Sequence, residues 1–497
     1  MICTSVMNPQ SSGLGGGVVF TVYNASTGTV EVINARETVP QEVPQNLLSG
    51  CAPLPIGSRW IAVPGEIRGY EEAHKRHGRL PWKSLFEPTI KLLSDPLVVS
   101  PVMDKIINHR NFSQVGRSLC PLICDGQRLL TRGETFRWPA LQQTLKTLAE
   151  NGATAFYEGQ IGKALVEDIR KAGSVITMED LKAYKAQVSS ALNITLNNDT
   201  TVFSPPPPMG GAVLLFILKI LEGKLLRENV LQEGETYHVI AEALKFGNML
   251  KPQMDDPAFS EVKELVAIML SDKTAERIRS QIDARGDHPL NHYSLWKTIN
   301  SHDYESKGTS HISVLAADGS AVSATSTINY PFGSFVYSNQ TGIILNNELA
   351  DFCTASRSIF PGDRHMGGII LSAFALGERP PSAMVPSILI SKSGDTLVIG
   401  GAGGAWIISA TAMAIINKLW FGYDLERAIS SPIMHTDKDS ILFEKHFSED
   451  VRKSLLKRGH KEQKVEISMN VVQGVSKEGK CISAYSDKRK LGKSAGY

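Results

Sequence analysis

The spacing of apolar residues predicts an amphipathic helix in the first third of the chain. Leu141, Leu145 and Leu148 fall on one helical face, and the pair Asn151-Gly152 follows them. Asparagine and glycine tolerate the left-handed backbone with which many helices end. The pattern therefore predicts a helix that stops at this pair.

Two further helices are indicated by other patterns. Thr177 and Asp180 form an acidic variant of the capping box, which marks the start of a helix. Residues 211–221 (GAVLLFILKIL) are the most apolar stretch of the chain, but Lys219 interrupts them. They are too short to cross a bilayer, which takes about 20 apolar residues. We expect a buried helix here and no membrane span.

The pattern changes to alternation over residues 304–328, which contain HISVLAADGSAVSATSTI. The Asp-Gly pair at 318–319 stands between two strand-like runs, a combination typical of a β-hairpin. A turn centred on this pair predicts Thr309 opposite Ile328 and Ser310 opposite Thr327. Thr327 should then lie beside Thr309.

A strand, a glycine loop and a helix are predicted in succession after position 395. TLVIG at 396–400 is followed by Gly401, Gly403 and Gly404, and then by an apolar stretch from Ile407 towards Leu419. Residues 205–208 and 356–381 are predicted to be loops. Because no repeat or composition break divides the chain, we expect one continuous alpha-beta domain.

Composition and motifs exclude several classes of function. The chain is 42% hydrophobic and 21% charged with a net charge of +2, so it lacks the basic excess of nucleic-acid-binding proteins. A phosphate loop ending at Gly492 would need glycine where Asp487 stands, and Val18 breaks the dinucleotide pattern after GLGGG. No G-x-S-x-G motif supports a serine hydrolase.

Cysteines and glycosylation sequons bear on the compartment. Of the six cysteines, only Cys120 and Cys124 are near enough in sequence to suggest a local disulfide, and no zinc pattern emerges. The first residues do not have the pattern of a secretory leader. Passage through the secretory pathway is nevertheless suggested by sequons at Asn24, Asn111, Asn193, Asn198 and Asn339.

The hairpin segment, KGTSHISVLAADGSAVSATSTIN, resembles the autoprocessing segment of the gamma-glutamyltransferase (glutathione hydrolase) family of N-terminal nucleophile enzymes. The resemblance implies that Thr309 cuts the chain after Gly308 and then serves as the nucleophile. Residues 1–308 and 309–497 would become the large and small subunits of one intertwined domain. The implied fold is α+β, a four-layer αββα sandwich.

The chemistry explains why such a nucleophile stands at a chain end. An α-amine titrates near 7.7 to 8.0, so it can take a proton from the neighbouring hydroxyl at neutral pH. Glycine at 308 fits, because the cleaved bond must distort and a side chain would resist. Thr327 matches the second threonine of the family, which hydrogen-bonds to the nucleophile.

The resemblance also assigns a site for the gamma-glutamyl group, whose carboxylate needs a guanidinium and whose ammonium needs carboxylates. EVINARE at 31–37 makes Arg36 the carboxylate ligand, with Asn329 as a second contact. NNELADF at 346–352 supplies Glu348 and Asp351 for the ammonium. Taken singly, each charged residue would be read as part of a solvated surface.

The resemblance assigns Gly403 and Gly404 to an oxyanion hole, although an isolated GAGG is more often a packing turn. Ser382 corresponds to a donor-site serine, but Ala383 stands where the family usually has a second one. The segment 354–374 also departs from the family pattern. An upstream anchor, a helix and a cysteine that would pair with Cys3 are absent from this sequence.

The resemblance implies hydrolysis of the gamma-glutamyl bond of glutathione and its S-conjugates, with transfer to acceptor amino acids or dipeptides. The sequence blocks are most similar to the type 5 branch of the family, associated with leukotriene C4. No cofactor, metal or nucleic acid is implied, and the location is the outer face of the plasma membrane. Two alternatives stay open: an unprocessed, inactive truncated relative, and another N-terminal nucleophile amidase, which would not need Arg36, Glu348 and Asp351.

Overall fold

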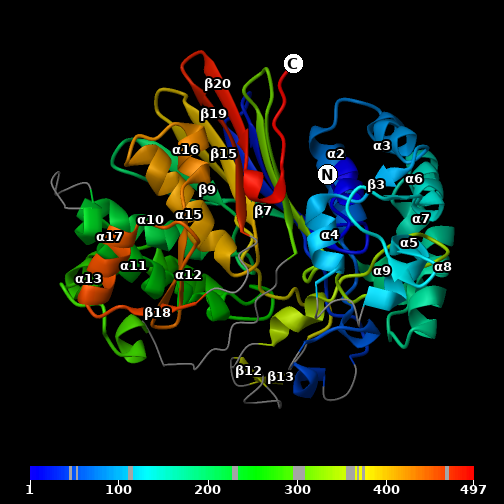
Figure 1. The fold of residues 1–497 in the computed structure, drawn as a ribbon, viewed down its shortest axis with the longest axis horizontal. Helices are drawn as coiled ribbons and strands as arrows, with labels where there is room; N and C mark the ends of the chain where they lie inside the picture. Colours follow the sequence, from blue (N-terminus) through cyan, green and yellow to red (C-terminus); the bar gives the residue numbers. More distant parts are fainter. Residues whose placement is uncertain are drawn as a thin grey trace.

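Two β-sheets lie face to face at the centre of the computed structural model, and helices cover their outer faces (Figure 1). The structure describes residues 1–43, 47–51, 54–109, 116–225, 233–294, 308–353, 364–366, 369–371, 375–464 and 470–497. None of the helices formed by these residues combines the length and the hydrophobicity that a membrane span requires.

The first sheet joins strands from distant parts of the chain in one antiparallel order. Its strands are, in order, β10 (Ser310–Leu315), β11 (Ala321–Thr327), β1 (Gly17–Asn24), β2 (Thr29–Ala35) and β7 (Gln187–Ser190). The hairpin β10-β11 therefore pairs with a strand from the beginning of the chain. Segments on both sides of Gly308 share this sheet.

The second sheet is also antiparallel and combines segments from both sides of Gly308. Its strands are, in order, β20 (Cys481–Ser486), β19 (Val471–Glu478), β15 (Thr396–Ala402), β14 (Ser387–Ser391), β9 (Thr200–Ser204) and β8 (Leu192–Thr195). Smaller pairings are formed by β3 (Leu97–Val98) with β6 (Thr135–Phe136), β4 (Cys124–Asp125) with β5 (Arg128–Leu129), and β16 (Met434–Asp437) with β17 (Ser440–Phe443) and β18 (Lys461–Gln463).

Short side chains fill much of the space between the two large sheets. The Thr21 hydroxyl donates to the carbonyl oxygen of Pro386 at 2.6 Å, and Ser323 donates to that of Ile399 at 3.0 Å. Small hydroxyl residues let the sheets approach while each buried polar atom finds a partner. The apolar part of this interface is a small cluster of Ala321, Ile388, Val398 and Val475.

Helices form the two outer layers and enclose the two main hydrophobic cores (Figure 1). The second sheet is covered by α10 (Gly211–Leu225), α11 (Glu233–Asn248), α12 (Val262–Met269), α13 (Asp272–Gln281), α15 (Trp406–Leu419), α16 (Leu425–Ser430) and α17 (Glu449–Lys457). The side of the first sheet carries α1 (Ile2–Met7), α2 (Glu66–His77), α3 (Glu87–Leu92), α4 (Pro101–Ile107), α5 (Cys120–Ile123), α6 (Pro139–Asn151), α7 (Thr154–Tyr157), α8 (Gln160–Lys171) and α9 (Met178–Ala183). The predicted αββα layering is confirmed.

Most local predictions are confirmed. The predicted leucines are buried on α6, which ends at Gly152 with φ of 69°, and Thr177 and Asp180 form the expected capping box of α9. The apolar stretch at 211–221 lies in α10. The glycine loop joins β15 to α15 as predicted.

The hairpin forms where it was predicted, but the predicted register is wrong. Ser310 pairs with Ser326, not with Thr327. Ala316 and Ser320 close the turn with a hydrogen bond of 2.8 Å, so it contains three residues, and Gly319 has φ of 86°. A three-residue loop with glycine in the left-handed region shifts the pairing by one position. Continuing this ladder places Thr309 opposite Thr327 instead of Ile328.

The loop predicted for residues 356–381 is partly wrong. Two short antiparallel strands, β12 (Arg364–Met366) and β13 (Ile369–Leu371), pair within it. Residues 375–381 are irregular, as predicted. The rest of this loop lies outside the described residues.

Candidate active site

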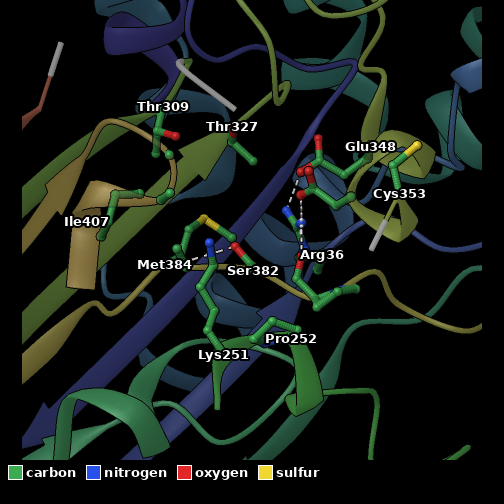
Figure 2. A pocket seen from close by; sticks show the side chains of 15 residues that line it. Arg36, Lys251, Pro252, Thr309, Thr327, Glu348, Cys353, Ser382, Met384 and Ile407 are labelled. Atoms are coloured by element: carbon green, nitrogen blue, oxygen red, sulfur yellow. Dashed lines mark hydrogen bonds and ion pairs between the residues drawn. The ribbon is translucent and has the colours of Figure 1, made fainter. Parts of the chain in front are cut away.

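A small cavity of about 50 Å³ opens where the two sheets end, and most of the predicted site residues line it (Figure 2). Thr309 precedes β10, Thr327 ends β11 and Arg36 follows β2. The threonines lie on one side of the cavity, and Arg36 lies with Glu348 on the other. The predicted site residues among its lining are Arg36, Thr309, Thr327, Glu348, Asp351, Ser382 and Gly404.

The Gly308–Thr309 bond is buried and lies directly before β10. The Thr309 hydroxyl donates to the carbonyl oxygen of Gly308, and only 3% of this threonine is exposed. The Gly308 amide donates to the carbonyl oxygen of Asn329 at 2.9 Å. A Cβ on Gly308 would come within 2.6 Å of that oxygen, so no larger residue fits here without rearrangement.

Thr327 is oriented towards the same carbonyl group. Its Oγ1 accepts a hydrogen bond from the Asn329 amide at 2.8 Å and lies 2.9 Å from the Gly308 oxygen. Because one lone pair is occupied by the amide, the hydroxyl proton is free to point at the carbonyl oxygen. Thr309 and Thr327 thus both polarise the Gly308 carbonyl.

Arg36 is buried in a cluster of carboxylates. These residues therefore do not belong to a solvated surface, as isolated charged residues usually do. Its guanidinium donates to Glu348, and to Asp351 at 2.5 Å. It also donates to the carbonyl oxygens of Pro380 and Pro381, each at 2.9 Å. The side chains of Arg36 and Glu348 are each 1% exposed and that of Asp351 is 16% exposed.

Burial and opposite charge act against each other in this cluster. Burial alone would lower the pKa of Arg36, but the charges of Glu348, Asp351 and Glu37 outweigh burial and raise it. Burial is also the main reason that the pKa values of Glu348 and Asp351 are raised, although Arg36 acts in the opposite direction. The arginine stays charged, and its charge partly offsets the effect of burial on the pKa values of both carboxyl groups.

Glu348 and Asn329 each have a buried acceptor atom that lacks a hydrogen-bond donor. Oε2 of Glu348 and Oδ1 of Asn329 have no partner among the described residues. The orientation of Asn329 is fixed, since its Nδ2 donates to Asp351 at 2.9 Å and to the carbonyl oxygen of Asn347 at 3.2 Å. Buried acceptors without donors are costly, so the pair is suited to a ligand that supplies N–H groups.

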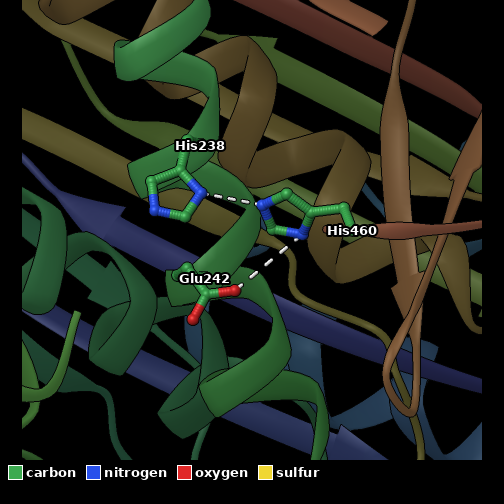
Figure 3. A group of neighbouring side chains, drawn as sticks. All are labelled: His238, Glu242 and His460. Atoms are coloured by element: carbon green, nitrogen blue, oxygen red, sulfur yellow. Dashed lines mark hydrogen bonds and ion pairs between the residues drawn. The ribbon is translucent and has the colours of Figure 1, made fainter. Parts of the chain in front are cut away.

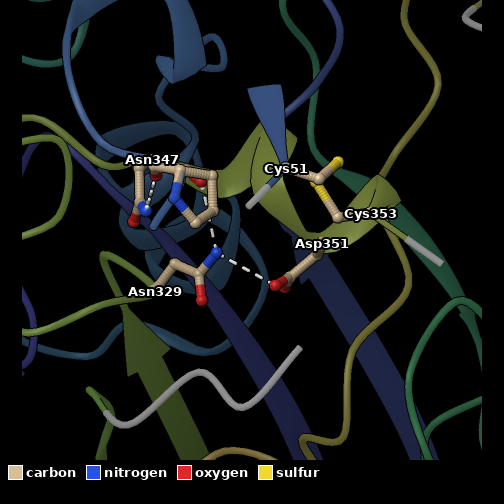
Figure 4. The surroundings of a disulfide bond; sticks show 6 residues. Cys51, Asn329, Asn347, Asp351 and Cys353 are labelled. Carbon is tan, nitrogen blue, oxygen red and sulfur yellow. Dashed lines mark hydrogen bonds between the residues drawn. A yellow bond between two sulfur atoms is a disulfide. The ribbon is translucent and has the colours of Figure 1, made fainter. Parts of the chain in front are cut away.

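A disulfide anchors the short helix that carries Glu348 and Asp351 (Figure 4). This 3-10 helix, η7 (Glu348–Phe352), is followed directly by Cys353, which is bonded to Cys51. The sequence analysis missed this bond because the two cysteines are 302 positions apart. Spacing gave no indication of it.

The glycine loop borders the cavity. Gly403 and Gly404 have φ of 126° and 62°, a region that glycine adopts without strain. Gly404 lines the cavity, whereas Gly403 is not part of its lining and packs against Asn470. A Cβ on Gly403 would come within 2.5 Å of the Asn470 Cα.

Ser382 and Ala383 both line the cavity. Ser382 is held by its own backbone, which donates to the carbonyl oxygen of Pro208 at 2.7 Å. Its Oγ accepts from the Met384 amide at 3.2 Å. The sequence analysis missed the remaining residues of the lining, for which no motif gave an indication: Lys251, Pro252, Cys353, Pro381, Met384, Ala405 and Ile407.

Away from this cavity, His238, Glu242 and His460 form a buried group of the kind that can bind metal (Figure 3). Lys245 reaches into the same group. Its Nζ lies 3.0 Å from Nδ1 of His460 and 3.2 Å from Oε1 of Glu242. The ammonium thus contacts the atoms that a cation would use.

The hydrogen bonds of this group can be assigned in one direction. Nε2 of His238 lies 2.7 Å from the carbonyl oxygen of Asp283, so that nitrogen carries the proton. Nδ1 of His238 then accepts from Nε2 of His460 at 2.7 Å, and Nδ1 of His460 accepts from Lys245. Burial lowers the pKa of His460 to about 2, in agreement with a neutral ring. The group fits an internal lysine cation better than a metal.

The other predicted positions are also located. Cys120 and Cys124 are bonded to each other, and Cys3 and Cys481 are exposed and unbonded. Sequon asparagines Asn193, Asn198 and Asn339 are exposed, and Asn24 is half-buried. Asn111 lies outside the described residues.

Comparisons with known proteins agree with this site. The gamma-glutamyltranspeptidase family model matches residues 1–497. Glutathione hydrolase 5 proenzyme of Homo sapiens is 48% identical, over 100% of this chain and 87% of that protein. Glutathione hydrolase 3 of Arabidopsis thaliana is 33% identical, over 99% of this chain and 82% of that protein.

The fold has a counterpart among solved structures. The cephalosporin acylase of Bacillus halodurans superposes with a TM-score of 0.84 at 22% identity, over 98% of this chain and 88% of that one. At this identity the likeness supports the N-terminal nucleophile hydrolase fold alone. The full-length family match establishes more: the chain belongs to the gamma-glutamyltranspeptidase family of gamma-glutamyltransferases and glutathione hydrolases.

Proposed function

We propose that this chain cleaves itself between Gly308 and Thr309 and then hydrolyses the gamma-glutamyl bond of glutathione and its S-conjugates. The contact of the Thr309 hydroxyl with the Gly308 carbonyl carries the first part of the proposal. Attack of Oγ1 on that carbonyl carbon breaks the C–N bond, the Thr309 nitrogen gains a proton, and an ester forms. Water then hydrolyses the ester, releasing the Gly308 carboxylate and a free Thr309.

The products are a large subunit, residues 1–308, and a small subunit, residues 309–497. Both sheets contain strands from each segment, so the two chains would stay together after cleavage without a covalent bond. Thr327, 2.9 Å from the Gly308 oxygen, supports the charge that develops on that oxygen during attack.

The charged cluster supports a zwitterionic substrate. A gamma-glutamyl group brings a carboxylate for Arg36 and an ammonium for Glu348 and Asp351, so charge balance is kept when it enters. Its N–H groups would satisfy Oε2 of Glu348 and Oδ1 of Asn329, which lack donors. Gly404, which lines the cavity, would donate its backbone N–H to the oxyanion together with Gly403, and Ser382 would contact the gamma-glutamyl group.

The gamma-glutamyl group would be carried as an ester on Thr309 and released to water or to an acceptor amino acid or dipeptide. Because the sequence blocks resemble the type 5 branch of the family, we include leukotriene C4 among the S-conjugates. We also propose a location at the plasma membrane and glycosylation at Asn24, Asn111, Asn193, Asn198 and Asn339.

Intact mass and N-terminal sequencing test the proposal. We expect two fragments, the smaller one beginning Thr309-Ser310-His311, and release of glutamate from glutathione and leukotriene C4. Thr309→Ala should stay uncut and inactive, whereas Thr309→Ser keeps a hydroxyl and should cut slowly. A single uncut parent chain without activity would favour the inactive, unprocessed reading.

A further inference from the structure

The side chain of Lys490 reaches the candidate nucleophile from the far end of the chain. Lys490 is the last residue of the 3-10 helix η8 (Lys488–Lys490), which Leu491 ends with φ of 56°. Its Nζ lies 3.4 Å from the carbonyl oxygen of Thr309, although the two residues are 181 positions apart. No motif in the sequence analysis pointed to this residue.

The backbone beneath Lys490 is firmly held. Asp487 is buried, caps η8 by accepting from the Arg489 amide at 3.0 Å, and accepts from the Val472 amide of β19 at 3.1 Å. Arg489 binds Asp487 at 2.7 Å and Glu444 at 2.8 Å. These bonds fix η8 against β19 and aim the lysine at Thr309.

The carboxylates nearby are occupied by other groups. Within the described ranges, no carboxylate lies within 4.0 Å of Nζ of Lys490, and this amine donates to the Thr309 carbonyl oxygen. Burial lowers the pKa of Lys490 to about 8, although the charge of Asp487 acts in the opposite direction. The amine is therefore still mostly protonated at neutral pH.

Thr309 needs such a contact once the chain is cut. The β10 ladder begins only at Ser310, and cleavage would remove the covalent bond to Gly308. The new α-amine stands on the same residue as the carbonyl that Lys490 holds. The positive charge of the Lys490 ammonium therefore disfavours protonation of this α-amine.

We propose that Lys490 is a positioning residue for the nucleophile: its ammonium holds the Thr309 carbonyl and keeps the adjacent α-amine in its uncharged, basic form. The inference rests on the proposed cleavage at Gly308–Thr309. During acyl transfer the α-amine takes the proton of Oγ1 as this oxygen attacks the gamma-glutamyl carbon. It then gives the proton to the leaving nitrogen as the C–N bond breaks, and Lys490 keeps its own proton throughout.

The other charged groups around Thr309 do not act in place of Lys490. Burial lowers the pKa of His311 to about 3, so that ring is neutral near pH 7. Asp487 and Arg489 neutralise each other beneath η8. Across the cavity, Arg36 forms ion pairs with Glu348 and Asp351, and Glu37 lies 3.8 Å from its guanidinium.

The pH dependence of kcat/KM tests the role of Lys490. A nearby like charge shifts the pKa of an amine by about one unit, so Lys490→Met and Lys490→Gln should move the acidic limb up by about one pH unit. At pH values below that limb, kcat/KM of these two variants should be about tenfold lower than that of the parent protein. Lys490→Arg keeps the charge and should keep the limb. The exposed Lys493→Met is the matched control and should leave the profile unchanged.

A second measurement uses the parent protein, so it does not depend on the folding of the variants. The α-amine of Thr309 in the parent protein is labelled with acetic anhydride across a pH series, and the N-terminal peptide is quantified by mass spectrometry. An amine that titrates at least half a unit below about 7.7 supports the proposal. Titration at or above this value, or an unchanged acidic limb in the Met and Gln variants, would overturn it. If no fragment begins at Thr309, the proposed function itself has failed.

Discussion

The imidazole of His311 occupies the space in which a side chain at position 400 would stand. A Cβ on Gly400 would come within 2.7 Å of Nδ1 and 2.8 Å of Nε2 of His311. The ring is held by Thr325 at 2.8 Å and by Ser313 at 3.0 Å. Because Gly400 has no side chain, β10, which follows Thr309, can lie close to β15, which leads to the glycine loop.

Gly400→Ala should therefore destabilise the protein and impair its maturation. Overpacking of a core costs about 1–3 kcal/mol, and here the ring of His311 would have to move. Chemical denaturation and the extent of cleavage measure the two effects. Gly13→Ala is the matched control, because its nearest heavy atom would be 4.0 Å away. Equal stability of the two variants would contradict the packing argument.

Arg36→Ala should remove most donor affinity. Hydrogen bonds to charged groups contribute about 1.5–3 kcal/mol each, so the loss in kcat/KM should be at least about 100-fold. Arg36→Lys keeps the charge but not the planar fork and should fall between the parent and the alanine variant.

The same variant separates the proposed enzyme from another N-terminal nucleophile amidase. Such an amidase would keep its activity on other acylated amines after Arg36→Ala. Thermal unfolding must be measured in parallel, since the variant leaves Glu348 and Asp351 buried without their partner. Unchanged kinetics on glutathione would contradict the assignment of Arg36.

Replacing Cys51 and Cys353 by serine should lower the stability and weaken substrate binding together. Loss of a native disulfide commonly costs about 2–5 kcal/mol. Because Cys353 directly follows η7, which carries Asp351, the variant should also raise KM for glutathione. Serine at Cys120 and Cys124 is the control, since this bond closes a short loop away from the cavity. A raised KM in both variants would count against a specific role for η7.

Glu66 should make stability depend on pH. Burial raises its pKa to about 8, although Tyr70 and Ser326 donate hydrogen bonds to it. The folded protein thus keeps a proton that the unfolded chain loses above pH 4.5. The resulting stabilisation is complete below pH 4.5 and is lost as pH rises towards about 8.

Comparison with Glu66→Gln isolates this effect. Each pH unit is worth about 1.4 kcal/mol, so between about pH 5 and pH 8 the parent should lose about 4 kcal/mol relative to the variant. Unfolding by urea at several pH values measures the difference. Parallel pH profiles of the two proteins would show that Glu66 does not hold a proton in the fold.

Much of the local structure and about half of the cavity lining could be predicted from the sequence. The cap of α9, the end of α6 and the glycine loop after β15 each depend on residues a few positions apart. The motifs around Arg36, Thr309 and Glu348 were each recognisable as short segments. The hairpin register was not predictable in the same way, because an Asp-Gly pair fits both two-residue and three-residue loops.

The sequence by itself determined helices α6, α9, α10 and α15, the hairpin and the family, since each is encoded in contiguous residues. Only the tertiary structure decided which distant residues meet: Cys51 with Cys353, Lys490 with Thr309, and Arg36 with Glu348. These pairs are brought together by two sheets whose strands come from distant parts of the chain. The physical reason is that pairing across a sheet depends on the whole core that the strands bury, and spacing along the chain carries no record of that core.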